Sequence, residues 1–445
     1  MVHFELPLTR RKLVQATGAA AGAAVLATGA AQAAPGHRGS SRLATAQDAT
    51  TVRALMWSNG PIIDGHFEDR MNAFNEAHAG EIEVDLQFLP WDQYWQKLQL
   101  AYASGDPYDI YFWDVQAYGH YKNGLIKNLQ PLIDETGALD PERYPTDKFD
   151  VWRLDGENMY AMPENFQTFA LYYNKALFDA EGLEYPNDTW TYDDFVAAAE
   201  ALTKRDGDRV TQWGCNTGNL SVWWGLQTLS WAAGDAFFDQ QLEPTKFQFA
   251  NDANVEALDF VRALVNDHKV APSPSVASNS PDTTGFQSGM VGMVLEGSWS
   301  ISGFAELPFE WGLTTSPLWK DNRVVPYWLG GWVIAEESDA AEAAFEWARW
   351  SADEYQMTMA GEHDWIPILN EARDSDVATE GMPDGYREVI DALSEARIGD
   401  VYSENTQQIW VEVFEPGLTS LLQDNRDAAE VAAEMDEKAN ELLAG

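Results

Sequence analysis

Strand-like and helix-like segments alternate in the first part of the chain. The apolar run "VRALMW" (52–57) ends in the loop sequence "SNGP" and predicts a buried strand. In "EIEVDLQF" (81–88) apolar and polar residues alternate strictly, which predicts a strand with one face in water. "YDIYFW" (108–113) predicts a third strand, and apolar residues at helical spacing separate the three. This order predicts a parallel sheet with crossover helices, an α/β fold whose ligands bind at the carboxyl ends of the strands.

The pattern starts again further along the chain. "MYAMP" (159–163) and "FALYYN" (169–174) predict two more strands, and "GMVGMVLEG" (289–297) and "YWLGGWVIAEE" (327–337) predict later ones. Thr191-x-x-Asp194 predicts a capped helix start. A chain of 445 residues exceeds what one compact core supports, so we expect two lobes.

The N-terminal segment has the features of an export signal. Arg10-Arg11-Lys12 precedes an Ala- and Gly-rich apolar run, which ends at the A-x-A sequence Ala31-Gln32-Ala33. The twin arginines resemble the signal of the twin-arginine export route, and the run is too weakly apolar for a stable membrane span. We therefore predict a signal peptide over 1–33, a flexible linker over 34–50 and an extracellular or cell-surface location. No cysteine stands at the cleavage point, so lipid attachment to cysteine is not expected.

The charge balance of the chain is strongly acidic. There are 71 Asp and Glu against 28 Lys and Arg, a formal net charge of −43, and the acidic residues are spread over the whole sequence. Such a surface stays soluble where salt screens its self-repulsion, so we interpret it as adaptation to a saline, haloarchaeal-like environment. A chain without a basic patch is not expected to bind nucleic acid.

Recognised catalytic and cofactor motifs are absent from the sequence. Cys215 is the single cysteine, in an apolar setting that favours packing over reactivity. The seven histidines are dispersed without an H-E-x-x-H pair, so neither a metal site nor a cofactor is expected. No phosphate-binding or nucleophile motif is present, which favours a binding protein over an enzyme.

Tryptophan is abundant, with 19 residues, several of them next to loop signals at predicted strand ends. An indole face packs against the C–H face of a sugar ring, while amides and carboxylates bond the sugar hydroxyls. The set therefore favours a carbohydrate ligand, although core packing remains the alternative for each single tryptophan.

Five stretches, in order, resemble the extracellular solute-binding proteins of ABC importers, the family typified by maltose-binding protein. They are "GDPYDIYFWDVQAYGHYKNGLIKNLQPLI", "GENMYAMPENFQTFALYYNKALFDAEGL", "TWTYDDFVAAAEAL", "FQSGMVGMVLEGSWSISGF" and "YWLGGWVIAEES". The resemblance covers nearly all of residues 52–440. It implies a two-lobed periplasmic-binding-protein fold with a hinge crossed several times and a ligand cleft between the lobes. The lobes would comprise 51–160 plus 318–352, and 161–317 plus 353–445.

The resemblance also implies particular ligand contacts. By position in the family these are Trp113, Gln116, Gln167, Phe169, Trp299 and Trp365. Gln167 stands where the family has an acid and Phe169 where it has Tyr, which argues against a maltose-like ligand. The residue types themselves add polar and aromatic candidates beside predicted strands, namely Trp57, Asn59, Asp114, Glu164, Asn165, Glu296 and Trp332.

Function is therefore predicted as capture of an extracellular carbohydrate by a non-catalytic, monomeric protein that delivers it to an ABC transporter permease. A polyamine or glycerol-phosphate-type ligand remains an alternative, as does a secreted glycan-active enzyme. Asn187 and Asn219 begin acceptor sequences for N-glycosylation.

Overall fold

The computed structural model describes residues 49–444. The predicted signal peptide and almost all of the predicted linker lie outside the described residues. The described residues belong to one compact unit. Within 49–444, no helix combines the length and the apolar composition that a membrane crossing requires.

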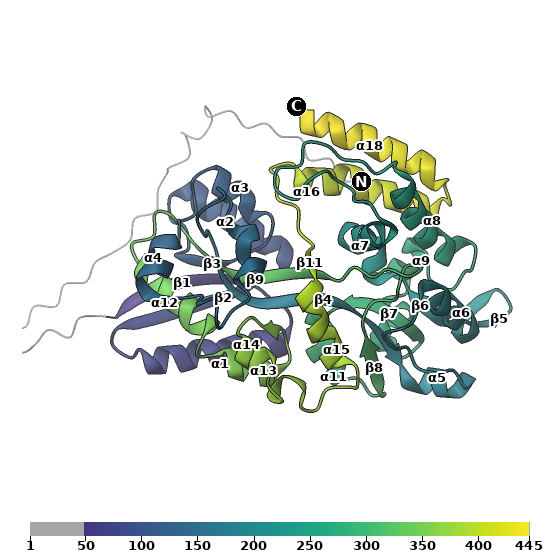
Figure 1. Cartoon of the computed structure of the whole chain (residues 1–445), viewed down its shortest axis with the longest axis horizontal. Helices are drawn as coiled ribbons and strands as arrows, with labels where there is room; N and C mark the ends of the chain where they lie inside the picture. Colours follow the sequence, from purple (N-terminus) through teal and green to yellow (C-terminus); the bar gives the residue numbers. More distant parts are fainter. Residues whose placement is uncertain (1–48, 445) are drawn as a thin grey trace, which may run out of the picture. The chain divides into compact units, whose positions relative to one another are not determined.

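One mixed sheet carries the fold, with its strands in the order β2-β1-β3-β9-β4-β7-β6-β5 (Figure 1). Two short strands, β8 and β10, pair with β4, and β11 pairs with β9. The strands are β1 (Thr50–Trp57), β2 (Ile82–Leu89), β3 (Ile110–Phe112), β4 (Met162–Asn174), β5 (Lys204–Asp206), β6 (Arg209–Asn216), β7 (Val291–Gly297), β8 (Trp311–Thr314), β9 (Pro326–Ile334), β10 (Ile366–Pro367) and β11 (Arg397–Ile398).

The predicted parallel strands at the start of the chain are confirmed. β1 pairs in parallel with β2 on one side and with β3 on the other. The two crossover helices between them are α1 (Pro61–Ala77) and α2 (Trp91–Ser104), which bury the predicted apolar faces around Phe67 and Leu98. Trp57 ends β1 and Trp113 directly follows β3, so the carboxyl ends of both strands carry a tryptophan.

The middle of the chain differs from the prediction of two strands at 159–163 and 169–174. The structure has one long strand, β4, which crosses the centre of the sheet (Figure 1). Its first half pairs with β9, with an irregularity between Pro163 and Asn165, and its second half pairs with β7 and β8. The intervening polar residues concealed this continuity, because Glu164, Asn165 and Thr168 are buried in spite of their polarity.

Helices surround the sheet. The longer ones after α2 are α6 (Tyr192–Leu202), α7 (Trp223–Ala233), α8 (Asp252–Asn266), α12 (Ala341–Ala352), α17 (Glu415–Gln423) and α18 (Ala428–Ala444). The shorter ones are α3 (Ala117–Lys122), α4 (Gln130–Thr136), α5 (Lys175–Glu181), α9 (Pro274–Asn279), α10 (Pro281–Thr284), α11 (Ile301–Ala305), α13 (Gln356–Glu362), α14 (Asn370–Arg373), α15 (Tyr386–Asp391) and α16 (Thr406–Ile409). Single turns are η1 (Thr146–Trp152), η2 (Gly218–Ser221), η3 (Phe286–Ser288), η4 (Ser298–Ser300), η5 (Val377–Thr379), η6 (Ala392–Glu395) and the π-helical η7 (Trp410–Phe414).

Local sequence signals explain several of these elements. The Thr191 hydroxyl accepts from the Asp194 N–H while the Asp194 carboxylate accepts from the Thr191 N–H, which is the capping box predicted for α6. Apolar residues at helical spacing are buried in α12, for example Phe345 and Trp347, and in α18, for example Val431 and Met435. Cys215 is fully buried, as expected of a packing thiol, and burial raises the pKa of its thiol.

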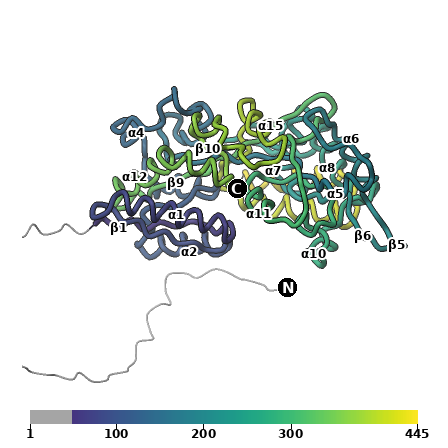
Figure 2. The backbone as a smooth tube through the Cα atoms, turned by 90° about the horizontal axis from the view of Figure 1, so that it is seen from below, coloured from purple at the N-terminus to yellow at the C-terminus, as the bar shows by residue number. Residues whose placement is uncertain are grey.

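Buried apolar side chains form two clusters, here called the first core and the second core. The first core holds β1, β2, β3, α1, α2 and α12, together with buried residues from 365 to 402. The second core holds α6, α7, α8, α17 and α18. β4 contributes to both, for example Phe166 to the first and Phe169 to the second. In Figure 2 the segment with β10 and α15 lies between the α1–α2 side and the α5–α6 side.

These observations confirm the α/β class. The exact residue ranges assigned to each lobe stay a prediction.

Candidate functional site

A cleft of about 540 Å³ lies where residues of the two cores meet. Seven of the residues predicted as ligand contacts line it: Trp57, Asn59, Trp113, Asp114, Gln116, Gln167 and Trp299. They come from loops after β1, β3 and β7 and from the middle of β4. The fold thus brings together side chains that lie up to 242 residues apart in the sequence, from Trp57 to Trp299.

One set of aromatic rings comes from elements of the first core. The Trp57 ring meets the rings of Trp91 and Phe112 edge to face, with centroids 5.0 and 5.2 Å apart. Asn59 Oδ1 accepts a hydrogen bond of 3.2 Å from the Trp57 indole N–H, which fixes the plane of that ring. Trp91 begins α2 and remains 41% exposed, so its face is free for a ligand.

A second set comes from α7 and η7. The Trp224 and Trp410 rings lie 4.6 Å apart at a small interplanar angle of 34°, and Trp223 meets Trp410 edge to face. Asn219 Oδ1 accepts from the Trp224 indole N–H at 3.1 Å, and the Glu415 carboxylate accepts from the Trp410 indole N–H. The indoles of Trp224 and Trp410 are therefore each held by a polar partner, and both rings line the cleft.

Between these two sets lie Gln167, Trp299 and Trp328. Phe169 is buried behind them and supports the walls, with its ring 5.9 Å from Trp299 and 4.8 Å from Trp328. Gly399 leaves room for the Trp328 indole, because a Cβ there would lie 2.4 Å from the ring. Gln167 Nε2 donates a hydrogen bond to Asn165 Oδ1 at 3.3 Å, and the Gln167 side chain also lines the cleft.

Two carboxyl groups in the cleft are buried enough to change their acidity. Burial raises the pKa of Asp114 to about 6, although the hydrogen bond from the Gln116 backbone N–H lowers it. Burial, together with repulsion from Asp114, raises the pKa of Asp400 to about 8, although the Tyr402 hydroxyl donates to it at 3.0 Å. Near neutral pH Asp400 therefore keeps its proton and can donate as well as accept a hydrogen bond.

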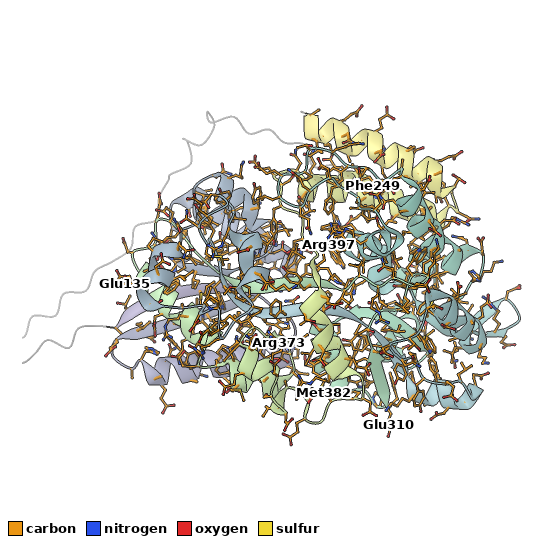
Figure 3. The ribbon with its side chains drawn as sticks, in the orientation of Figure 1. Glu135, Phe249, Glu310, Arg373, Met382 and Arg397 are labelled. Carbon is orange, nitrogen blue, oxygen red and sulfur yellow. The ribbon has the colours of Figure 1, made fainter. Side chains whose placement is uncertain are left out.

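Basic side chains are missing from the lining. None of the lining residues, all of which belong to the described part of the chain, is Lys, Arg or His, whereas Asp92, Asp114, Asp400 and Glu415 are acidic. Arg373 and Arg397 lie near the middle of Figure 3, but neither reaches the cleft. The Arg397 guanidinium stacks over the Trp231 ring at 4.3 Å, and Arg373 donates to the Ile368 carbonyl at 3.3 Å.

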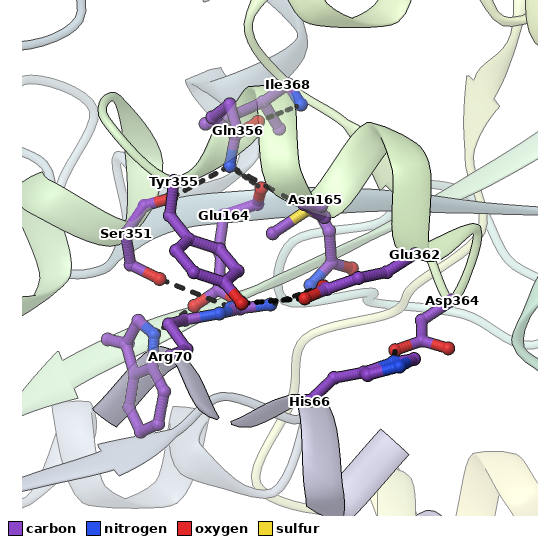
Figure 4. Close-up of polar contacts among 12 residues, drawn as sticks. His66, Arg70, Glu164, Asn165, Ser351, Tyr355, Gln356, Glu362, Asp364 and Ile368 are labelled. Atoms are coloured by element: carbon purple, nitrogen blue, oxygen red, sulfur yellow. Dashed lines mark hydrogen bonds and ion pairs between the residues drawn. The ribbon is translucent and has the colours of Figure 1, made fainter. Parts of the chain in front are cut away.

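The other six predicted site residues lie outside this lining. Trp332 and Trp365 are fully buried in the first core, and Phe169 is buried in the second. Glu164 accepts from the Arg70 guanidinium and from the Trp332 indole, and Asn165 is buried beside it (Figure 4). Glu296 accepts from the Asn219 amide at 2.5 Å and from the Gly297 N–H at 2.9 Å. These hydrogen bonds join the side chains of Glu164 and Glu296 to other residues of the chain, which gives both a structural role.

Sequence reasoning missed several lining residues, among them five tryptophans. They are Trp91, Trp223, Trp224, Trp328 and Trp410. Trp91 opens α2 and the Trp223-Trp224 pair opens α7, and an apolar ring next to a turn is the signal that could have found them. Trp410 carries no such signal, because it lies in a short π-helical turn. Asn219 is buried and bonded to Glu296, so of the two glycosylation sequons only Asn187 is exposed.

Two arabinooligosaccharide-binding proteins are similar to this chain in sequence. An arabinooligosaccharide-binding protein of Halalkalibacterium halodurans is 26% identical over 211 residues, which cover 46% of this chain and 44% of that protein. An arabinooligosaccharide-binding protein of Bacillus subtilis is 22% identical over 302 residues, 65% of this chain and 66% of that protein. The chain thus spans about half to two thirds of the length of these curated relatives.

Among solved structures, the ABC substrate-binding protein Lmo0181 from Listeria monocytogenes, in complex with cycloalternan, superimposes with a TM-score of 0.80 at 23% identity. The match covers 89% of this chain and all of that one. The two-lobed fold predicted from the sequence is therefore confirmed. Residues 58–357 match the family described as bacterial extracellular solute-binding proteins, and the chain belongs to that family.

Proposed function

We propose that this protein captures an extracellular carbohydrate, from a monosaccharide to a small oligosaccharide, and delivers it to the permease of an ABC transporter. The observation that carries the proposal is the cleft itself, lined by eight tryptophans together with amides and carboxyls, without a basic side chain. Its volume of about 540 Å³ falls in the range of roughly 300–1,000 Å³ usual for small-molecule sites.

The chemistry of the lining suits a sugar. Indole faces such as those of Trp91 and Trp410 offer flat apolar surfaces to the C–H faces of pyranose or furanose rings. Asn59, Gln116 and Gln167 can both donate to and accept from hydroxyl groups. The protonated carboxyl of Asp400 adds one more group with both properties.

The proposed mechanism is a population shift. A ligand that touches Trp57 beside the first core and Trp224 beside the second gains contacts from both sides at once. Such a ligand favours the closed arrangement of the lobes, and closure would present a composite surface to the permease. Similarity to arabinooligosaccharide-binding proteins and to a cycloalternan-bound protein supports an oligosaccharide. We further propose that the protein is non-catalytic and monomeric and is exported by the twin-arginine route.

An organic cation such as a polyamine is the second candidate. The acidic residues Asp92, Asp114 and Glu415 of the lining, together with tryptophan rings, are groups that bind ammonium ions. A phosphate ester is disfavoured, because the lining has no group that would neutralise it.

The test is a titration of the mature protein in high salt with arabino-, malto- and manno-oligosaccharides, and in parallel with spermidine and glycerol 3-phosphate. Calorimetry and tryptophan fluorescence report binding, and chromatography of the sugar reports any hydrolysis. We expect binding to at least one oligosaccharide without turnover. Binding to spermidine alone would select the second candidate, and turnover would identify an enzyme.

A pair of variants locates the site. Trp91→Ala removes an exposed cleft ring and is expected to weaken sugar binding about 10- to 100-fold. Trp213→Ala is the control, since Trp213 is a half-buried tryptophan of β6 that lies outside the cleft. Equal losses in both variants would place the sugar elsewhere.

A further inference from the structure

Three side chains with metal-ligand chemistry meet at the edge of the first core. His66 lies on α1, Glu362 ends α13, and Asp364 lies in the turn before β10 (Figure 4). Each offers one ligand atom, and these atoms all lie within 4.8 Å of one another. His66 Nδ1 and Asp364 Oδ2 are 2.5 Å apart although the residues are 298 positions apart in the sequence. Sequence reasoning expected no metal site, because this cluster exists only after folding.

Two carboxylate oxygens in this cluster lack a hydrogen-bond partner. Asp364 Oδ1 and Glu362 Oε2 are both buried and accept no hydrogen bond from the described residues. The side chain of Asp364 is only 4% exposed, so water does not compensate for this loss. A buried anionic oxygen without a donor is costly, and a bound cation is one way of satisfying it.

Charge around the cluster is also unbalanced. Two carboxylates, Glu164 and Glu362, share one guanidinium, that of Arg70, whereas Asp364 pairs with His66. Arg70 donates to Glu164, whereas its nearest approach to Glu362 is 3.7 Å. The Tyr355 hydroxyl donates to Glu362 Oε1 at 2.6 Å, so Oε2 is the oxygen of this carboxylate without a donor. The negative charge at Glu362 and Asp364 is therefore only partly compensated by the chain.

We propose that His66, Glu362 and Asp364 bind a divalent cation of the zinc class. One imidazole nitrogen and two carboxylate oxygens form a ligand set that zinc accepts, with water in the fourth position. Tetrahedral ligands at about 2.0–2.2 Å from one ion lie about 3.3–3.6 Å from one another. The 2.5 Å contact between His66 Nδ1 and Asp364 Oδ2 would therefore open on binding, and the separations of up to 4.8 Å would shorten. His66 is 31% exposed and provides the route by which the ion enters.

The site would join two parts of the chain that are distant in sequence. α1 follows the first strand of the sheet, whereas the segment of Glu362 and Asp364 leads into β10, which pairs with β4 at Asn165 and Phe166. A bound ion would therefore tie α1 to the central strand. Because ligands that bind only the folded state stabilise it, the ion is expected to raise the melting temperature. This inference does not rest on the proposed sugar binding.

The test is calorimetric titration of the chelator-treated mature protein with Zn²⁺ in high salt, which screens the acidic surface. We expect one Zn²⁺ per chain and a higher melting temperature with the ion. His66→Gln and Asp364→Asn, which change volume little, are each expected to weaken binding about 100-fold or more and to abolish the thermal shift.

His78→Gln is the matched control. His78 follows the same helix and lies 3.5 Å from the Glu346 carboxylate, but has no third ligand beside it. Its zinc affinity should equal that of the wild type. Undiminished binding in the His66 and Asp364 variants would overturn the proposal, and so would absence of stoichiometric binding to the wild-type protein, a result that needs no variant to fold.

Discussion

Buried carboxyl groups occupy two regions of this molecule, and their charge is compensated in different ways. Beside α1, Glu164 accepts hydrogen bonds from the Arg70 guanidinium and the Trp332 indole. In the cleft, Asp114 and Asp400 have no basic residue among the lining side chains, and burial raises the pKa of both. In the first region other residues of the chain donate hydrogen bonds to Glu164. In the second region the charge of the carboxyls is compensated by a proton or by a ligand.

This difference separates structural acids from binding acids. The Arg70 guanidinium and the Trp332 indole hold Glu164 in one position, so its contribution is to stability. A buried carboxyl without such a partner has a perturbed pKa and polar atoms that still lack strong partners, which is typical of a site that binds something. The distinction predicts that substitutions in the two regions affect different properties.

The largest effect is expected at Arg70. Arg70→Met removes the partner of fully buried Glu164 and should lower the free energy of unfolding by about 3–5 kcal/mol. Urea unfolding of the purified protein measures this loss. Arg70→Lys keeps the charge without the planar guanidinium, so its free energy of unfolding should lie between those of the wild type and of Arg70→Met. A loss below about 1 kcal/mol in Arg70→Met would mean that Glu164 does not depend on this ion pair.

Tryptophans in the two regions should likewise differ. Trp410→Ala removes a half-buried ring of the cleft, and we expect an about 10- to 100-fold loss of sugar affinity with a small change in stability. Trp347→Ala empties a fully buried position of the first core and should cost about 3–5 kcal/mol of stability. Calorimetric titration and urea unfolding of both variants measure the two properties. The reverse result would contradict the assignment of the cleft as binding site.

A pH-dependent effect is expected at Asp400. An unfolded Asp has a pKa of about 3.9, whereas burial raises the pKa of Asp400 to about 8. The folded protein therefore binds this proton more tightly than the unfolded chain does. The stability that the proton contributes is complete below about pH 4 and is lost as the pH rises to about 8. Asp400→Asn removes the titration and should exceed the wild type in stability above about pH 8, by about 2 kcal/mol or more.

Thermal unfolding of both proteins between about pH 5 and 9 checks this expectation. The melting temperature of the variant should fall less with rising pH than that of the wild type. Parallel profiles would show that Asp400 ionises as freely in the folded protein as in the unfolded one. Asp364→Asn is not a suitable comparison, since Asp364 belongs to the proposed metal site.

Much of the fold could be predicted from the sequence, because periodicity reports which side of an element is buried. The strict alternation in β2 and the apolar spacing in α1 gave correct elements. β4 was predicted as two strands, because Glu164 and Asn165 interrupt its apolar pattern. Their burial depends on partners such as Arg70, which lies 94 residues away, and no local pattern reports such a partner.

The site could be predicted only in part for the same reason. Trp57 and Trp113 end strands of a parallel sheet, and topology brings such ends together. Trp332 and Trp365 have similar sequence surroundings but point into the first core. Trp410 reaches the cleft from a segment that joins the second core late in the chain, so its position follows from tertiary packing alone.

The smallest effect is expected at Arg143, whose guanidinium binds Asp353 through two hydrogen bonds of 2.8 and 2.6 Å at the surface. Arg143→Met should cost no more than about 1 kcal/mol of unfolding free energy, since both partners are partly hydrated already. This cost should shrink further in high salt, whereas the cost of Arg70→Met should change little, because the Arg70–Glu164 pair is shielded from ions by burial. Urea unfolding of both variants in low and high salt measures the contrast. Equal salt dependence would mean that the acidic surface of the whole chain, with its net charge of −43, determines the stability of both ion pairs. Burial would then make no difference between the two pairs.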